Sequence, residues 1–274
     1  MPFKDLLVHV DASKYCRERL RVAAGLARRF KAHFAGIYVM PAFEVPPFLA
    51  DQFPRGALDD VDAKAAMGRD AAKELFDACA SQSGLETEWI EERGDATELV
   101  AKYARHRDIT VVGQIAPEVV SMGIEATLPE KVALSTGRPV LLVPYAGAFE
   151  TVGERVLIAW NESPQAARAV GDALPILIGA KQVTILEVGA VDPSSAIDGG
   201  IAAHLRRHGV KVEAERIEAD DVEIGEFLLS RAADGAADLI VMGIYGHSRM
   251  RELVLGGASR QVLQHMTVPV LMSH

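Results

Sequence analysis

Five small residues near the carboxyl end of the chain have the types and spacing of a phosphate-binding segment. Two glycines follow an apolar run, a nine-residue connection from 247 to 255 comes next, and two more glycines and a serine then open a helical pattern. Glycines let backbone N–H groups approach an anion closely, and a helix N-terminus adds unpaired donors and a favourable dipole. The sequence therefore predicts phosphate binding by Gly243, Gly246, Gly256, Gly257 and Ser259.

Motifs of enzymatic turnover are absent from the sequence. It contains no G-x-x-x-x-G-K-[ST] loop, no G-x-S-x-G elbow and no H-E-x-x-H pair. The two cysteines, Cys16 and Cys79, lack C-x-x-C spacing, which disfavours a zinc site or a disulfide framework. We therefore expect a binding protein with no catalytic residue and no protein-bound metal.

The chain repeats itself. Residues 6–13, LLVHVDAS, match residues 156–163, VLIAWNES, at an offset of 150 residues. Residues 108–113, DITVVG, match residues 238–243, DLIVMG, at an offset of 130 residues. Repetition over this length predicts two copies of one structural unit.

The two offsets define the domains and an insertion. We expect domains at 1–146 and 152–274, with about 20 extra residues in the first, within the stretch 41–84. The insertion begins with several prolines and continues as an Ala-rich, charged run over about 58–81. It is therefore predicted to be a loop that leads into a long helix.

The elements that must position the glycines and the serine belong to an α/β fold. Short Val-, Ile- and Leu-rich runs alternate with helical patterns, which is typical of a parallel sheet covered by helices on both faces. Strands are predicted near 4–10, 33–39, 86–91, 109–113 and 139–144, and again near 155–160, 182–188, 210–216, 238–242 and 268–272.

In such a sheet, ligands bind beyond the carboxyl ends of the strands where the strand order reverses. Asn161 follows the first strand of the second repeat, and Asp11 is its counterpart in the first. Each of these residues is predicted either to contact a ligand or to serve only as a turn or cap. Ser13 and Ser163 are predicted to be N-caps of the helices that follow.

Charge and hydropathy exclude other classes of partner. The net charge of -9 disfavours nucleic acid, which basic surfaces bind. No apolar run is long enough to cross a membrane, and the first residues, MPFKD, do not resemble a signal peptide. We expect a cytoplasmic protein that contacts neither nucleic acid nor membrane.

The order of a strand, Gly243-x-x-Gly246, nine residues, Gly256, a helix and the apolar run 268–271 resembles the ATP-binding pattern of the universal stress protein family. The resemblance extends over both repeats. It implies two tandem, doubly wound, Rossmann-like sheets of the adenine nucleotide alpha hydrolase type, each with strand order 3-2-1-4-5. It also implies that the two units pair through their fifth strands as a pseudo-dimer within one chain.

The family's nucleotide contacts match the second repeat in most positions. The resemblance implies a backbone contact of Val188 with adenine and ribose or phosphate contacts in the loop that holds Met242, Gly243 and Gly246. It implies phosphate contacts at Gly256 and Ser259, with ATP or a related adenine nucleotide as ligand and magnesium only as its counter-ion.

Two positions of the second repeat depart from the family pattern. Gly257 replaces the usual Ser or Thr, so one hydroxyl is missing while the backbone N–H remains. Asn161 replaces the usual Asp, so a charge is missing while hydrogen-bonding capacity remains. Both residues stay in the predicted site.

The first repeat departs further. Asp11 and Val39 occupy the family positions, but the loop has Ala116 and the helix start has Ala126 where the family has glycines. A methyl group hinders close approach to phosphate. We therefore predict no nucleotide site of the family type in the first repeat.

Three functions remain open at this stage. The first is a stress-response regulator that binds an adenine nucleotide in the second domain, signals to an unknown protein partner, forms a homodimer of tandem chains and hydrolyses ATP slowly at most. The second is a scaffold without nucleotide whose insertion at 41–84 binds a partner. The third is a binder of another small molecule near Asp11 and His9 in the first domain.

Overall fold

The computed structural model describes residues 2–41, 57–81, 84–120, 127–188, 199–217, 224–244 and 257–274. Its strands are β1 (Asp5–Val10), β2 (His33–Met40), β3 (Thr87–Arg93), β4 (Ile109–Gly113), β5 (Val140–Val143), β6 (Arg155–Trp160), β7 (Gln182–Val188), β8 (Val212–Ile217), β9 (Leu239–Gly243) and β10 (Val270–Ser273). Its helices are α1 (Cys16–Phe30), α2 (Ala57–Ser81), α3 (Ala96–Ala104), α4 (Pro117–Val120), α5 (Leu128–Ser135), α6 (Pro164–Leu177), α7 (Gly200–Arg207), α8 (Ile224–Asp234) and α10 (Ala258–His265).

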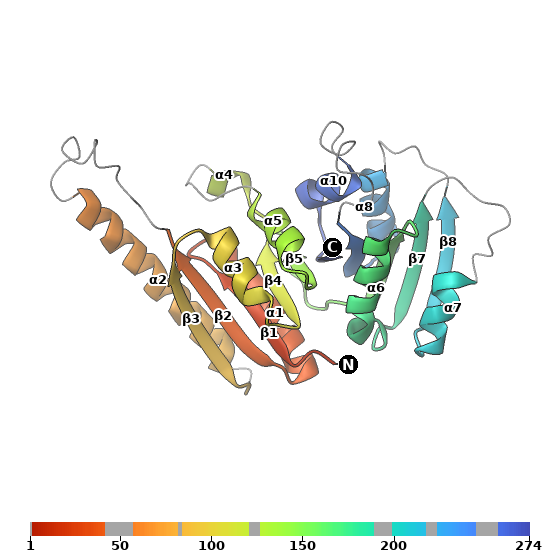
Figure 1. Ribbon diagram of the computed structural model, residues 1–274, viewed down its shortest axis with the longest axis horizontal. Helices are drawn as coiled ribbons and strands as arrows, with labels where there is room; N and C mark the ends of the chain where they lie inside the picture. The colour runs from red at the N-terminus through yellow and green to blue at the C-terminus, as the bar shows by residue number, and fades with distance from the viewer. Residues whose placement is uncertain are drawn as a thin grey trace.

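The ten strands form one sheet in the order β3-β2-β1-β4-β5-β10-β9-β6-β7-β8 (Figure 1). The N-terminal half, β1 to β5, and the C-terminal half, β6 to β10, each have the order 3-2-1-4-5 with parallel neighbours. They join where β5 and β10 pair antiparallel, with Leu141 opposite Leu271. The topology and the fifth-strand pairing that the resemblance implied are confirmed.

Alternation of buried side chains along the strands supplies two cores. In β1, Leu6, Val8 and Val10 face the core beneath α1, α2, α6 and α7, and Leu7 faces the core beneath α3, α5, α8 and α10. Strands covered on both faces need apolar residues at every position, which explains why they read as continuous apolar runs.

The long helix of the insertion is confirmed as α2, and the loop predicted before it falls on residues 42–56, outside the described residues. Phe76 of α2 stacks on Phe34 of β2 with ring centroids 5.1 Å apart. A Cβ on Gly36 would lie 2.7 Å from the Phe76 ring, so glycine makes room for this contact. The N-terminal part of α2 extends beyond the ends of β2 and β3 (Figure 1).

One of the two predicted helix caps is confirmed. Ser163 caps α6, and its side chain accepts a hydrogen bond from the Ala166 N–H at 3.1 Å. The prediction for Ser13 is wrong, because α1 begins only at Cys16. Asp11 accepts the Ser13 N–H at 2.9 Å, and the Ser13 carbonyl accepts the Cys16 N–H, so a turn precedes the helix.

Candidate functional site

The carboxyl ends of three strands meet at one edge of the C-terminal half. β6 pairs in parallel with β7 on one side and with β9 on the other, so the strand order reverses between β6 and β9. Asn161 follows β6, Val188 ends β7, and Met242 and Gly243 end β9. The structure therefore brings four of the predicted site residues to the edge at which open α/β sheets bind ligands.

The N-terminus of α10 lies at the same edge, toward which β7 and β8 point in Figure 1. Gly257 is its N-cap residue, and the Gly257 carbonyl accepts the N–H groups of Arg260 at 2.9 Å and Gln261 at 3.2 Å. Earlier N–H groups in the first turn have no acceptor within the helix. Ser259, 5% exposed, is part of this turn. Gly246 and Gly256 lie outside the described residues.

Gly243 has a structural role that the phosphate pattern did not suggest. A Cβ on Gly243 would lie 2.6 Å from the backbone nitrogen of Ala166 and 2.6 Å from the carbonyl carbon of Gln165. Its φ is not positive, so close approach, and not a left-handed conformation, requires glycine. The first turn of α6 therefore lies directly against the end of β9.

Asn161 forms a turn at the end of β6. Its Oδ1 accepts the Ser163 N–H at 3.2 Å, and Glu162 between them has a positive φ of 58°. The side chain of Asn161 is exposed at the edge of the sheet. Asn161 therefore serves as a turn residue and is also exposed to solvent.

The N-terminal half fills the corresponding position with its own ion pair. Arg19 of α1 is 3% exposed and donates from Nη2 to Asp11 Oδ2 at 2.7 Å. A Cβ on Gly113, at the end of β4, would lie 2.3 Å from Nη1 of Arg19. At an offset of 150 residues the counterparts of Asp11 and Arg19 are Asn161 and the fully buried Ala169, so the C-terminal half lacks both charges.

This ion pair sets the local electrostatics. Burial raises the pKa of the Asp11 carboxyl, but the neighbouring Arg19 outweighs that effect and the pKa lies well below its usual range. Burial, helped by Arg19, lowers the pKa of His9 to about 4, so this strand histidine is neutral at pH 7. With Ser13 on one oxygen and Arg19 on the other, the Asp11 carboxylate is committed to internal partners.

The helix starts of the two halves also differ. At an offset of 130 residues, Pro129 of α5 stands where α10 has Ser259. Proline has no N–H and no hydroxyl, so α5 loses two donors that α10 keeps. Thr127, the N-cap residue of α5, makes no capping hydrogen bond. Ala116 is buried, and Ala126 lies outside the described residues.

An acidic side chain lies on α4, the short helix that follows β4. Glu118 of α4 accepts a hydrogen bond from the Tyr15 hydroxyl and pairs with Lys14 at 3.2 Å. Hydrogen bonding to Tyr15 lowers the pKa of Glu118 to about 2, so its carboxylate is ionised. Lys14 compensates the charge of this carboxylate, and the absence of a family-type site in this half stays a prediction.

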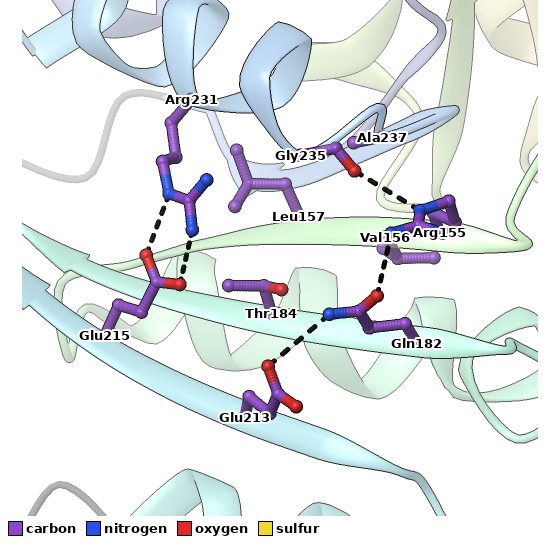
Figure 2. A pocket seen from close by; sticks show the side chains of 10 residues that line it. All are labelled: Arg155, Val156, Leu157, Gln182, Thr184, Glu213, Glu215, Arg231, Gly235 and Ala237. Carbon is purple, nitrogen blue, oxygen red and sulfur yellow. Dashed lines mark hydrogen bonds and ion pairs between the residues drawn. The ribbon is translucent and has the colours of Figure 1, made fainter.

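The cavity in Figure 2 lies at the opposite edge of the C-terminal half, near the amino ends of β6, β7 and β8. Its volume is about 100 Å³, and Arg231 pairs with Glu215 across it. Sites for ligands of nucleotide size are several times larger. A second cavity of about 380 Å³ lies between α1 and the segment 149–154, where Arg29 donates to the carbonyls of Val152 and Ile176. Neither cavity belongs to the predicted site.

Within the described part of the chain, no helix is long and apolar enough to cross a membrane. No three His, Cys, Asp or Glu side chains there are grouped so as to hold a metal ion. The thiols of Cys16 and Cys79 are both free.

The sequence analysis missed two residues that organise the edges of the sheet. Arg19 was not singled out, although its replacement by Ala169 at the same offset is visible in the sequence. Gln114 was not singled out either, yet its side chain reaches the C-terminal half and donates to the carbonyls of α10. No local pattern signals that contact.

Comparison with known proteins agrees with this architecture. Universal stress protein Slr1230 of Synechocystis sp. is 24% identical over 293 residues, which cover 98% of this chain and 99% of that protein. The crystal structure of a universal stress protein from Archaeoglobus fulgidus covers 98% of this chain and 95% of its own, with a TM-score of 0.76 and 18% identity, and shares the fold.

Some universal stress proteins bind adenine nucleotides. One has been solved in complex with cAMP and another, from Archaeoglobus fulgidus, in complex with dAMP. Their TM-scores against this chain, 0.38 and 0.36, are too low to carry a ligand over. Residues 153–274 match the universal stress protein family itself. This match places residues 153–274 in the universal stress protein family, and the repeated topology and the full-length relative extend the similarity over the whole chain as a tandem, two-domain protein.

Proposed function

We propose that this protein is a stress-response regulator whose C-terminal half binds ATP or a related adenine nucleotide. One observation carries the proposal. α10 opens with Gly257 and Ser259 at the carboxyl edge of β6 and β9, while the counterpart helix of the N-terminal half opens with Pro129 beside an internally paired Asp11.

The proposed contacts follow from this edge. The backbone of Val188 meets adenine, and Met242 and Gly243 flank the ribose. The phosphates accept hydrogen bonds from the first turn of α10, whose N–H groups and dipole favour an anion. Asn161 contributes an uncharged amide where the N-terminal half has a carboxylate, which reduces repulsion of the phosphates. Gly246 and Gly256 complete the proposed set, and magnesium accompanies the nucleotide only as a counter-ion.

Mass spectrometry of small molecules released from the purified full chain tests the ligand's identity and stoichiometry. We expect at most one adenine nucleotide per chain, because only the C-terminal half has Gly257 and Ser259 at a helix start and the uncharged Asn161 after its first strand. Two equivalent nucleotides per chain would contradict the assignment. The absence of detectable binding at millimolar ATP in calorimetry would defeat the proposal itself.

Exchange of the two helix starts supplies a matched pair of variants. Ser259→Pro removes an N–H and a hydroxyl, and proline is tolerated in the first turn of a helix. We expect the affinity for nucleotide to fall at least tenfold, roughly the loss of 1.4 kcal/mol from charge-assisted hydrogen bonds. Pro129→Ser changes the counterpart helix, where we expect no effect on affinity. Equal affinities for the wild type and Ser259→Pro would place the phosphates elsewhere.

A second candidate function is the scaffold, in which α2 binds a protein partner. Met67 of α2 is 73% exposed, the most exposed large apolar side chain among the described residues. It lies on the insertion, which the C-terminal half lacks. Met67→Glu is expected to abolish binding of the protein partner by α2 and to leave nucleotide binding unchanged. Met67→Leu is the conservative control.

The expected homodimer of tandem chains also remains a proposal. β5 is already flanked by β4 and β10, and β10 by β9, so fifth-strand pairing is used within the chain. A dimer would therefore need another surface. Light scattering at micromolar concentration distinguishes a mass of one chain from that of two.

A further inference from the structure

Gln114 connects the N-terminal half to the helix of the proposed nucleotide site. It follows β4 directly, and its Nε2 donates to the carbonyl oxygens of Leu263 at 2.9 Å and Gln264 at 3.0 Å. Its Oε1 accepts the N–H of Tyr145 at 3.3 Å, which holds the amide from the other side. All three bonds depend on one side chain that is partly buried at the boundary between the halves.

The acceptors are the carbonyls that a helix leaves unpaired. The last four C=O groups of an α-helix have no intrahelical partner and need donors from elsewhere. α10 ends at His265, and the C-cap residue Met266 has an extended backbone, with φ −59° and ψ 135°, so no left-handed cap follows. Gln114 therefore supplies from the N-terminal half a cap that α10 does not form itself.

The capped helix is short. Its eight residues make about two turns and span about 12 Å, so its two ends move together as one rigid unit about Val262, which is fully buried. Gly257 and Ser259 lie at the other end. A shift of the C-terminal carbonyls consequently displaces the N–H groups that the proposed function assigns to phosphate.

We propose that Gln114 is a positioning residue for the nucleotide site, through which the N-terminal half controls binding in the C-terminal half. The proposal rests on the proposed function. The arrangement runs in one direction only, because the counterpart of Gln114 at an offset of 130 residues is Ile244, a fully buried side chain without a donor. The half without the predicted site thus supports the half that has it.

Two substitutions of Gln114 distinguish the effect of its hydrogen-bond donor from the effect of its side-chain volume. Gln114→Met keeps the length and removes the donor, whereas Gln114→Lys keeps a donor that favours helix C-terminal carbonyls. We expect Gln114→Met to weaken nucleotide binding by about fivefold, the equivalent of one net hydrogen bond. Gln114→Lys is expected to bind within about twofold of the wild type, since it still donates to the two carbonyls.

Hydrogen exchange of the full chain without nucleotide gives an independent readout. In Gln114→Met the amides of α10 are expected to exchange faster, and in Gln114→Lys they are expected to match the wild type. Arg168→Met is the matched control, because it removes another hydrogen bond between the halves, from Arg168 Nη2 to the Gly137 carbonyl at 3.1 Å, without touching α10. We expect it to leave both exchange in α10 and nucleotide affinity unchanged.

The outcomes separate the two proposals. If the wild type binds no nucleotide, the proposed function fails, and the positioning role falls with it. If the wild type and Gln114→Met bind nucleotide equally, the proposed function stands and the positioning role is overturned. If Gln114→Lys is as weak as Gln114→Met, or Arg168→Met weakens binding as much, the effect does not come from capping and the inference is also overturned.

Discussion

Removal of Arg19 tests how much its buried ion pair with Asp11 stabilises the N-terminal half. The Arg19 and Asp11 side chains are 4% and 16% exposed, and they are 2.7 Å apart. Arg19→Met keeps most of the apolar volume and leaves the Asp11 carboxylate buried without its counter-charge. Loss of one partner of a buried pair costs about 3–5 kcal/mol of the free energy of unfolding, and we expect about 3 because Asp11 keeps the Ser13 N–H.

A double variant copies part of the chemistry of the C-terminal half into the N-terminal half. Asp11→Asn combined with Arg19→Met removes both charges and keeps an oxygen that accepts the Ser13 N–H, as Asn161 does for Ser163. Replacement of a buried pair by neutral groups is often nearly neutral. We therefore expect the double variant to regain at least about 2 kcal/mol over Arg19→Met.

The pH dependence has a definite sign. In the wild type the lowered pKa of Asp11 gives stability that is present above the ordinary carboxyl range and is lost as the pH falls through the lowered value. In Arg19→Met the arginine no longer outweighs burial, so the pKa of Asp11 rises relative to the wild type. The loss of unfolding free energy is therefore largest at pH 7 and shrinks as the pH falls. His9 also makes the stability difference between the wild type and Arg19→Met smaller at lower pH. Its pKa of about 4 makes the wild type lose stability from pH 6.5 downward, and removal of Arg19 weakens that loss.

The assay is urea unfolding of the full chain, followed by tryptophan fluorescence. Trp89 lies in the N-terminal half and Trp160 in the C-terminal half, so a Trp160→Phe background reports on the altered half alone. The gap between the wild type and Arg19→Met is expected to narrow from pH 7 to pH 5. A cost below about 1 kcal/mol, no recovery in the double variant, or a gap that widens toward acid would refute the reasoning.

Two further predictions concern the edge of the C-terminal half. Gly243→Ala is expected to lower the free energy of unfolding by about 1–3 kcal/mol, because its Cβ would meet the backbone of α6 at 2.6 Å. Gly171→Ala lies within α6, where a Cβ would meet nothing within 4 Å, and is expected to raise it by about 0.5–1 kcal/mol. Thermal unfolding compares the two variants, and equal effects would contradict this prediction. Ser163→Ala is expected to lower the free energy of unfolding by about 1 kcal/mol through loss of the N-cap. Ser13→Ala is expected to change it by less than about 0.5 kcal/mol, because Ser13 caps no helix. Comparable losses for the two variants in urea unfolding would argue against the observed helix starts.

Much of the fold was accessible from the sequence. The predicted strands 155–160 and 182–188 coincide with β6 and β7, and that predicted near 210–216 is displaced by only one or two residues from β8. Strands covered on both faces need apolar residues throughout, so their signal is local and strong. The repeat then supplied the number of units, because the same signals recur in the same order.

The site was predictable only in part. Asn161, Val188, Met242 and Gly243 reach one edge because each follows or ends a parallel strand, which strand order alone requires. The reason for glycine at 243 was not predictable, because it depends on how closely α6 approaches β9. Ser13 was assigned as a cap from its type and position, and the assignment failed because a turn, in which the Ser13 carbonyl accepts the Cys16 N–H, delays the start of α1.

The chain by itself determined the repeat, the strands and the difference between the helix starts at Pro129 and Ser259, since all of these depend on residue type and spacing. Tertiary structure determined that Arg19 is buried against Asp11 and that Gln114 caps a helix of the other half. The physical reason is that burial of a polar side chain is costly unless partners accept its hydrogen bonds, and the fold decides which partners lie beside it. Partners 8 and 149 residues away become neighbours only when the sheet has formed.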